Sequence, residues 1–224
     1  NFLAEAANRE AVAMAIDREA LIARFGIDGW RPSTRVVPSD LEGDLGTIGE
    51  RWSDMTIDGR RALASARVAL WRNSRPQNEP VRLRIGLPDG PGSDILFSQL
   101  EEDFAAIGIE AVRASGGGKA DLRLIDTVAR YPRATWFLNR LNCKVQKGPC
   151  DSDADARVAE ASKTDDPAER SALLAEAEAE LTEANIYIPF GSPVRWSLVR
   201  SDVNAFEANG WAWHPLMPMA LRPK

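Results

Sequence analysis

The sequence predicts an α/β fold in which a mixed sheet is flanked by helices. The first observation is residues 81–112, which read as a strand, a glycine-rich turn, a helix and a second strand. Such a unit places its two strands parallel, with a right-handed crossover. The second observation is the alternating pattern of residues 120–125, which adds a strand. The third is a set of amphipathic helical patterns on both sides of this region.

Two short helices and a long connection are predicted at the start of the chain. Asn8 is suited to cap a helix over residues 9–16, and Asp17 is suited to cap a second helix that Gly26 ends. Residues 27–55 then contain scattered glycine and proline with little periodicity. We expect this stretch to be a long surface connection.

Cap residues also bound the two helices on either side of the first strand. Thr56 opens a helix over residues 58–72, whose apolar face is narrow. In the strand–helix–strand unit, Ser93 is suited to cap the crossover helix and Gly108 to stop it. The turn before Ser93 therefore leads directly from the first strand into a helix.

Further helices and two strands are predicted in the second half of the chain. They are a short helix within residues 127–142, helices over residues 152–163 and 166–184, and strands over residues 186–190 and 194–199. Asp166 is a cap residue and Pro167 suits the first helical turn. Pro189 places its strand at a sheet edge or at a strand end.

Charge and hydropathy exclude two classes of partner. The 224-residue chain has a net charge of -5, and acidic and basic residues are mixed along it. No basic stripe for nucleic acid is present, so we expect no nucleic-acid partner. No apolar run reaches the roughly 18 residues that a membrane-spanning helix needs.

The two cysteines, Cys143 and Cys150, leave two alternatives open. A metal site is excluded because the single histidine, His214, is distant in sequence and the spacing is not that of a zinc site. In an oxidising compartment a disulfide would close this short loop, with a gain of about 2 to 3 kcal/mol. In a reducing compartment the two residues would be small apolar thiols.

No motif for catalysis or cofactor binding is present. The glycine run 116–118 and Lys119 lack the Ser or Thr and the following helix of a phosphate-binding loop. His214 is in an aromatic C-terminal stretch, and no nucleophile motif precedes it. We therefore expect no enzyme, no metal and no cofactor.

Five segments resemble those of one protein family, in the same order. They are residues 8–22 with Ala-Ile-Asp-Arg, residues 96–112 with Ile-Gly-Ile before a strand, and residues 120–143, 165–190 and 194–200. The chain resembles the family 5 extracellular solute-binding proteins of ABC importers, which bind dipeptides, oligopeptides and nickel complexes.

The resemblance implies a class II periplasmic-binding-protein-like lobe. Members of the family are about twice as long as this chain, with two lobes around a ligand cleft, and the chain matches the C-terminal portion. We expect residues 1–200 to form the second lobe. The tail, residues 201–224, would pack on an N-terminal lobe outside this sequence, which would explain Trp211 and Trp213 in a coil.

The same resemblance implies a function and a location. The protein would capture a small peptide-like solute between its lobes and deliver it to a membrane permease, without covalent chemistry. It would work in the periplasm of a Gram-negative bacterium, an oxidising compartment in which Cys143 and Cys150 form a disulfide.

Ligands of open α/β sheets bind beyond the carboxyl ends of the strands. The residues expected there are Asp89, Ser93, Asp126, Arg130, Tyr131 and Trp136. Peptide-binding members have an Asp-Tyr pair before the proline and helix that follow, and the matching pair here is Arg130-Tyr131. Because an arginine there would repel a peptide's amino group, we expect a ligand with an anionic group near Arg130, or a shifted alignment in which Asp126 serves instead.

Two other classes of function compete with transport. An interaction or sensory module could reuse the same lobe without a permease, and an α/β enzyme domain is a more distant alternative. Neither alternative is marked by a motif in the sequence.

Overall fold

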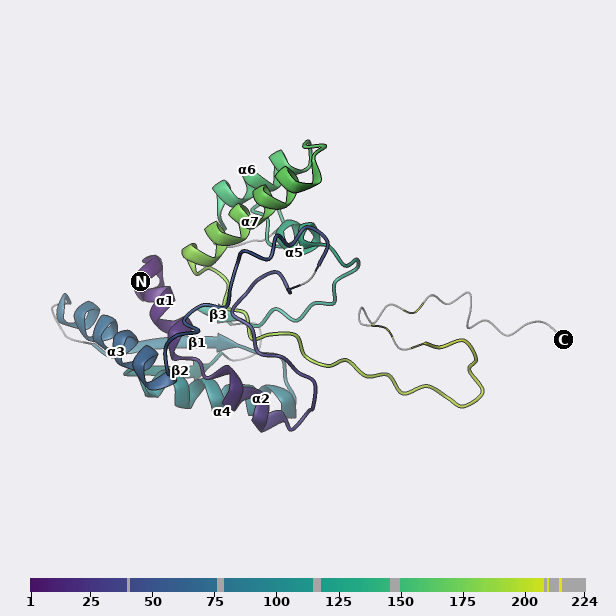
Figure 1. Cartoon of the computed structure of the whole chain (residues 1–224). Helices are drawn as coiled ribbons and strands as arrows, with labels where there is room; N and C mark the ends of the chain where they lie inside the picture. Colours follow the sequence, from purple (N-terminus) through teal and green to yellow (C-terminus); the bar gives the residue numbers. More distant parts are fainter. Residues whose placement is uncertain are drawn as a thin grey trace.

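The computed structural model describes residues 1–39, 41–75, 79–114, 118–145, 150–207, 209 and 214. The elements are η1 (Phe2–Ala4), α1 (Ala6–Ala15), α2 (Arg18–Phe25), α3 (Ile57–Asn73), β1 (Val81–Gly86), α4 (Pro91–Ala105), β2 (Ile109–Arg113), β3 (Leu122–Arg123), α5 (Ala134–Arg140), α6 (Ser152–Ala161) and α7 (Pro167–Ala184). In the view of Figure 1, α5, α6 and α7 lie above the strands, α2 and α4 lie below them, and the C-terminal segment extends away from the rest.

The sheet has three parallel strands in the order β2-β1-β3. Val81 of β1 pairs with Ile109 of β2, and Ile85 of β1 pairs with Leu122 of β3. The predicted strand–helix–strand unit is thus confirmed. The third strand is shorter than predicted because only Leu122 and Arg123 pair.

The strands predicted over residues 186–190 and 194–199 are wrong, and with them the mixed character of the sheet. In the described part of the chain neither stretch pairs with another strand, and the nearest pairing is one isolated bridge between Arg31 and Ser192, which lies between the two stretches. Pro189 lacks the N–H that a ladder needs, and no neighbouring strand offers the second stretch a partner. Among the described residues, every ladder is parallel.

One face of the sheet carries the larger hydrophobic core. Val81, Leu83 and Ile85 point into it, where they meet apolar side chains from α1, α2, α3, α4 and β2. The opposite face of β1 carries exposed arginines, Arg82 and Arg84, which form ion pairs with Glu110 and Asp121. Helices therefore cover this sheet on one face, and the other face is polar.

A second, smaller core lies in α5, α6 and α7. It contains Leu138, Val158, Leu174 and Leu181, with Val37 contributed by the long N-terminal connection. Figure 1 shows these three helices together, above the sheet in that view. The chain thus has two separate apolar clusters.

The long connection links the two cores. Arg35 is buried between Asp44 and Glu178, with N···O distances of 2.9 and 2.8 Å. The backbone N–H of Val37 also donates to Glu178 Oε1 at 3.2 Å. The stretch predicted as a surface connection is therefore partly buried, because a charged triad and Val37 fix it to α7.

Most predicted helix ends are confirmed, and two caps are wrong. The side chains of Asp17, Thr56 and Asp166 accept the capping hydrogen bonds of α2, α3 and α7. Gly26 ends α2 with φ of 60°. In contrast, α1 begins before Asn8, whose side chain donates to the carbonyl of Phe2 at 2.9 Å.

Ser93 is the second cap that differs from the prediction. The N-cap of α4 is Gly90, whose φ is 137°, and Pro91 is the first residue of the helix. Proline suits this position because the first N–H groups of a helix have no intrahelical partner. The glycine-rich turn thus enters the helix earlier than the serine suggested.

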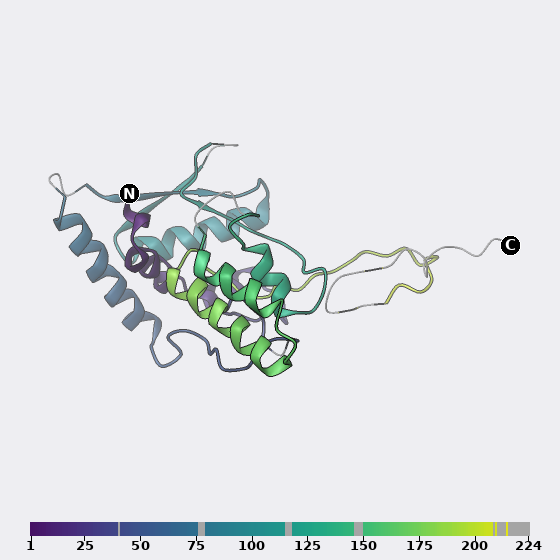
Figure 2. The same ribbon diagram turned by 90° about the horizontal axis from the view of Figure 1, so that it is seen from above.

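The segment after residue 192 leaves the body of the molecule, as Figures 1 and 2 both show. Trp196 is 81% exposed and Leu198 is 93% exposed. The structure therefore shows no change at residue 200, where the boundary between the lobe and the tail was expected, because the chain already leaves the body of the molecule before that residue. Trp211 and Trp213 lie outside the described residues.

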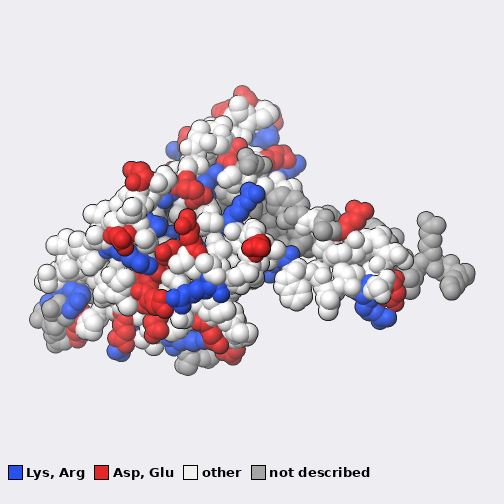
Figure 3. Space-filling view, turned by 60° about the horizontal axis from the view of Figure 1, so that its bottom comes forward, with Lys and Arg blue, Asp and Glu red and all other residues white. Residues whose placement is uncertain are grey.

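The surface mixes the two signs of charge. Figure 3 shows acidic and basic side chains interspersed over the face in view, with no extended basic region. Within the described residues, no helix combines the length and the apolar character that crossing a bilayer requires.

Candidate functional site

The carboxyl ends of β1 and β3 lie side by side. The N–H of Asp121 donates to the carbonyl of Arg84 at 2.8 Å, and the N–H of Leu124 donates to the carbonyl of Gly86 at 3.1 Å. The turn after Gly86 and the segment after Leu124 therefore leave the sheet at the same edge. In open α/β sheets this edge is where ligands bind.

A hollow of about 240 Å³ lies beyond this edge, next to Asp126. Its other lining residues are Pro193, Val194, Arg195 and Trp196. The Arg195 guanidinium donates to the Asp126 carboxylate, and both side chains are exposed. The hollow thus joins the segment after β3 to the extended C-terminal segment.

The groups in this hollow suit a peptide-like ligand. A carboxylate, a guanidinium and an exposed indole together offer one site for a cation, one for an anion and one for an apolar or aromatic side chain. An exposed ion pair contributes about 0 to 1 kcal/mol, so a charged ligand can replace either partner at little cost. Asp126 and Arg195 can therefore exchange their mutual contact for contacts to a ligand.

Arg130, Tyr131 and Trp136 follow on the same connection and the helix after it. Arg130 is exposed and Tyr131 is 42% exposed, so both are open to a ligand. Trp136 is half-buried and meets the ring of Phe137 edge-on, with centroids 5.1 Å apart. The tryptophan therefore has one structural contact and part of its surface free.

Asp89 and Ser93 differ in accessibility. Asp89 is exposed in the turn after β1, whereas Ser93 is buried within the first turns of α4. Arg113 braces this turn, since its guanidinium donates to the carbonyl of Pro88 at 3.1 Å and pairs with Asp94. No contact in the described residues joins Asp89 to Asp126. The predicted ligand residues after β1 and those after β3 therefore remain two separate groups.

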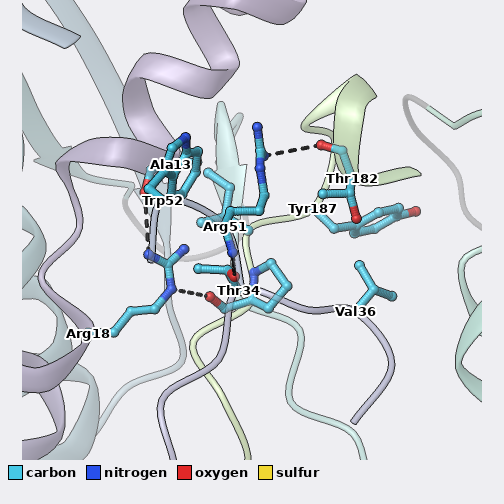
Figure 4. Close-up of a pocket in the computed structure, with 10 residues that line it drawn as sticks. Ala13, Arg18, Thr34, Val36, Arg51, Trp52, Thr182 and Tyr187 are labelled. Atoms are coloured by element: carbon cyan, nitrogen blue, oxygen red, sulfur yellow. Dashed lines mark hydrogen bonds between the residues drawn. The ribbon is translucent and has the colours of Figure 1, made fainter. Parts of the chain in front are cut away.

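A second cavity, of about 10 Å³, lies at the junction of the two cores and is shown in Figure 4. Arg18 projects into it, and its Nε donates to the carbonyl of Pro189 at 2.8 Å. Burial, together with the nearby charge of Arg60, lowers the pKa of Arg18 to about 10. The Arg18 charge is satisfied by backbone carbonyls.

Arg51 closes the same cavity from another side. Its guanidinium pairs with Glu10 of α1 at 2.9 Å and donates to the carbonyl of Thr182 of α7 at 3.2 Å, as Figure 4 shows for the second contact. Burial also lowers the pKa of Arg51. A cavity of this volume holds about one water molecule and is too small for a peptide. The contacts of Arg51 join α1 to α7 at this point.

Cys143 and Cys150 form a disulfide, with their Cα atoms 5.1 Å apart. The predicted disulfide is thus present. The N–H of Cys143 donates to the carboxylate of Asp155 on α6 at 3.0 Å, which ties the bridge to that helix.

No group of three His, Cys, Asp or Glu side chains in the described residues could hold a metal ion. His214 stacks on Phe206, with ring centroids 4.1 Å apart.

Arg195 and Trp196 were missed as candidate binding residues. The alternation of residues 194–199 was interpreted as a strand, which would have assigned these side chains to a sheet face. The sequence alone held no signal against that interpretation, because the absence of a neighbouring strand is visible only in the structure.

No established family profile matches the chain. Di/tripeptide-binding protein 2 of Pseudomonas aeruginosa (strain UCBPP-PA14) is 25% identical over 217 residues, which cover 88% of this chain and 39% of that protein. The chain therefore spans about two fifths of the length of this curated relative.

Solved structures share the fold. OppA of Burkholderia pseudomallei matches with a TM-score of 0.72 and 19% identity over 84% of this chain and 39% of that one. The murein tripeptide binding protein MppA of Escherichia coli matches with a TM-score of 0.71 and 19% identity over 85% of this chain and 40% of that one. The class II periplasmic-binding-protein-like fold is confirmed, and so is the resemblance to family 5 solute-binding proteins.

Proposed function

We propose that the chain is one lobe of the solute-binding component of an ABC importer and that it helps to capture a small peptide-like solute in the periplasm. The supporting comparisons are the similarity to a di/tripeptide-binding protein and the fold shared with OppA and MppA. The observation that carries the proposal is the hollow at the carboxyl ends of β1 and β3, where charged and aromatic groups meet. These relatives are binding proteins, which favours binding without covalent chemistry.

The opposing wall of the cleft would come from an N-terminal lobe. The hollow beside Asp126 is open, and the segment that forms its second side extends into solvent with Trp196 exposed. A second lobe docked against this segment would enclose the ligand, and closure of the two lobes would present it to a membrane permease.

Charge decides which end of a peptide this lobe would hold. Arg130 is exposed on the connection between β3 and α5, and a guanidinium can bind a carboxylate in a bidentate manner. We infer that the ligand places an anionic group near Arg130. Asp126 and Arg195 line the hollow and would bind a further charged group.

The test uses the full-length protein that contains this chain, with dipeptides and tripeptides as probes in calorimetric titrations. We expect Arg130→Ala to weaken the best peptide at least about tenfold, the loss of roughly one charge-assisted hydrogen bond. Arg133→Ala is the matched control, because Arg133 is also exposed but is paired with Glu42 at 2.9 Å.

The outcomes separate two claims. Unchanged affinity in the Arg130 variant would refute the anionic contact while leaving peptide binding intact. Absence of binding to every peptide probe by the unaltered protein would refute the proposed ligand class itself.

A further inference from the structure

Helix α3 packs on the rest of the molecule through one side only. Ala64 and Val68 are buried against the larger core, and Arg61 on the flank pairs with Asp103 at 2.5 Å. Figures 1 and 2 both place α3 at the edge of the molecule, with α1 on its inner side and no described element on its outer side. These buried contacts hold one side of α3 against the larger core and so determine which side of the helix faces outward.

The outer side of α3 is apolar over two turns. Its exposed residues are Ala62, Leu63, Ala66, Ala69 and Leu70. Leu63 is 51% exposed and Leu70 is 71% exposed, and they are seven residues apart. A single exposed leucine is ordinary, but two leucines at heptad spacing with alanines between them match the seam of a paired helix.

One edge of this seam carries complementary charges. Asp58, Ser65 and Arg72 follow each other at intervals of seven residues, so they lie along the same edge of the helix. Among the described residues, neither Asp58 nor Arg72 takes part in an ion pair. The acidic group is in the first turn and the basic group is in the last turn.

We propose that α3 pairs with α3 of a second copy of the protein in an antiparallel, two-fold symmetric dimer centred near Ser65 and Ala66. In such a dimer each residue meets its mirror position along the helix. Leu63 would pack over Ala69 of the other copy, and Leu70 over Ala62. Each large side chain thus meets a small one, which is the arrangement that fills a helix interface.

The charges support the antiparallel direction. Equivalent edges of two antiparallel helices face each other, so Asp58 of each copy lies opposite Arg72 of the other and two new ion pairs form. The two helix dipoles point in opposite directions in this pair, so the positive end of each lies beside the negative end of the other, which is favourable. Arg67 lies on the other edge near the two-fold axis, but its charge is paired with Glu10 of its own chain.

A second copy is favoured over an unrelated helix because the pattern is complementary to itself. The interface is small, since one helix pair buries less than the roughly 1,600 Å² of a standard interface. We therefore expect a weak dimer that depends on protein concentration. Its formation is independent of the proposed ligand and requires no peptide.

The test exchanges the charges between copies. Sedimentation equilibrium of the full-length protein is measured for Asp58→Arg alone, for Arg72→Asp alone and for an equimolar mixture of the two. Each variant alone places like charges in both pairs, so we expect at least about tenfold weaker dimerisation. The mixture restores both opposite-charge pairs in a mixed dimer, so we expect affinity near that of the unaltered protein.

Two controls separate this surface from other causes. Each single change also opposes the helix dipole and lowers the stability of the monomer, and mixing cannot restore monomer stability. Val145→Ser removes a half-exposed apolar side chain from the segment between α5 and α6, and we expect it to leave dimerisation unchanged. A monomer at all concentrations, or a mixture no stronger than the single variants, would overturn the proposal.

Discussion

At the scale of single residues, the buried triad of Arg35, Asp44 and Glu178 fixes the connection between the two cores. All three side chains are less than 7% exposed, at 4%, 6% and 2%. The two carboxylates hold the pKa of Arg35 above its usual value despite its burial. Removing one member leaves a buried charge with fewer partners, which is the costly case for such a group.

We predict that Glu178→Ala lowers the free energy of unfolding by about 3 kcal/mol or more. The matched control is Glu176→Ala on the same helix, where an exposed ion pair with Arg157 is lost and about 1 kcal/mol or less is expected. Urea unfolding of both variants checks the difference. Equal losses in the two variants would contradict a special role for the buried triad.

Glu50 is the basis of a prediction about how the stability of the fold depends on pH. Burial tends to raise the pKa of Glu50, but hydrogen bonds from Thr34 and Ser33 outweigh it, so the folded pKa lies below its ordinary value. A lowered folded pKa contributes stability above the unfolded pKa of about 4.3, and this stability is lost as the pH falls through the folded value.

Glu50→Gln should therefore unfold at a lower temperature than the unaltered protein at pH 7, and the difference should shrink below about pH 4. Thermal unfolding followed by circular dichroism from pH 3 to pH 7 measures it. A difference that stays constant over this range would show that Glu50 does not carry the effect.

Candidate ligand residues were only partly predictable from the sequence. Asp126, Arg130 and Tyr131 could be placed beyond a strand end because the alternation of the strand before them was readable, and all three are exposed. Ser93 could not be placed correctly. A serine three residues into a helix and a serine at its cap look alike in sequence, and here Gly90 and Pro91 determine where the helix begins.

At the scale of elements, helices were more predictable than strands. The ends of α2, α3 and α7 are set by side chains next to them in sequence, so local chemistry was sufficient. A strand also needs a neighbour to pair with, which the sequence of the strand does not specify. Residues 194–199 have the alternation but no neighbour in the described chain, and they remain extended and exposed.

The disulfide between α5 and α6 gives a prediction at this scale. Cys143→Ser with Cys150→Ser should lower the free energy of unfolding by about 2 to 3 kcal/mol, because the short loop regains freedom in the unfolded chain. Urea unfolding under oxidising conditions measures the loss. The comparison with the unaltered protein under reducing conditions is the control, and there the two should have nearly the same stability.

At the scale of the whole molecule, the C-terminal segment exposes large apolar side chains. Trp196 and Leu198 lie largely in solvent, on a segment that leaves the body of the lobe. Together with the share of each relative that the chain spans, this supports a missing lobe as their partner.

We predict that Trp196→Ser with Leu198→Ser destabilises the full-length protein by about 2 kcal/mol or more, since two large apolar side chains lose their burial. In the isolated chain the same changes should leave stability within about 0.5 kcal/mol, because the side chains are already exposed. Thermal unfolding of both lengths tests this. Equal effects in the two lengths would contradict a lobe docked on this segment.

The two apolar cores have a consequence for how the molecule opens. Arg51 joins α1 to α7 through polar contacts, Arg35 fixes the long connection to α7, and the two apolar clusters share no buried residue. The three-helix bundle can therefore come apart without exposing the apolar face of the sheet. We therefore expect α5, α6 and α7 to unfold as a separate cooperative unit, whose amide protons exchange with solvent through a smaller opening than those of β1.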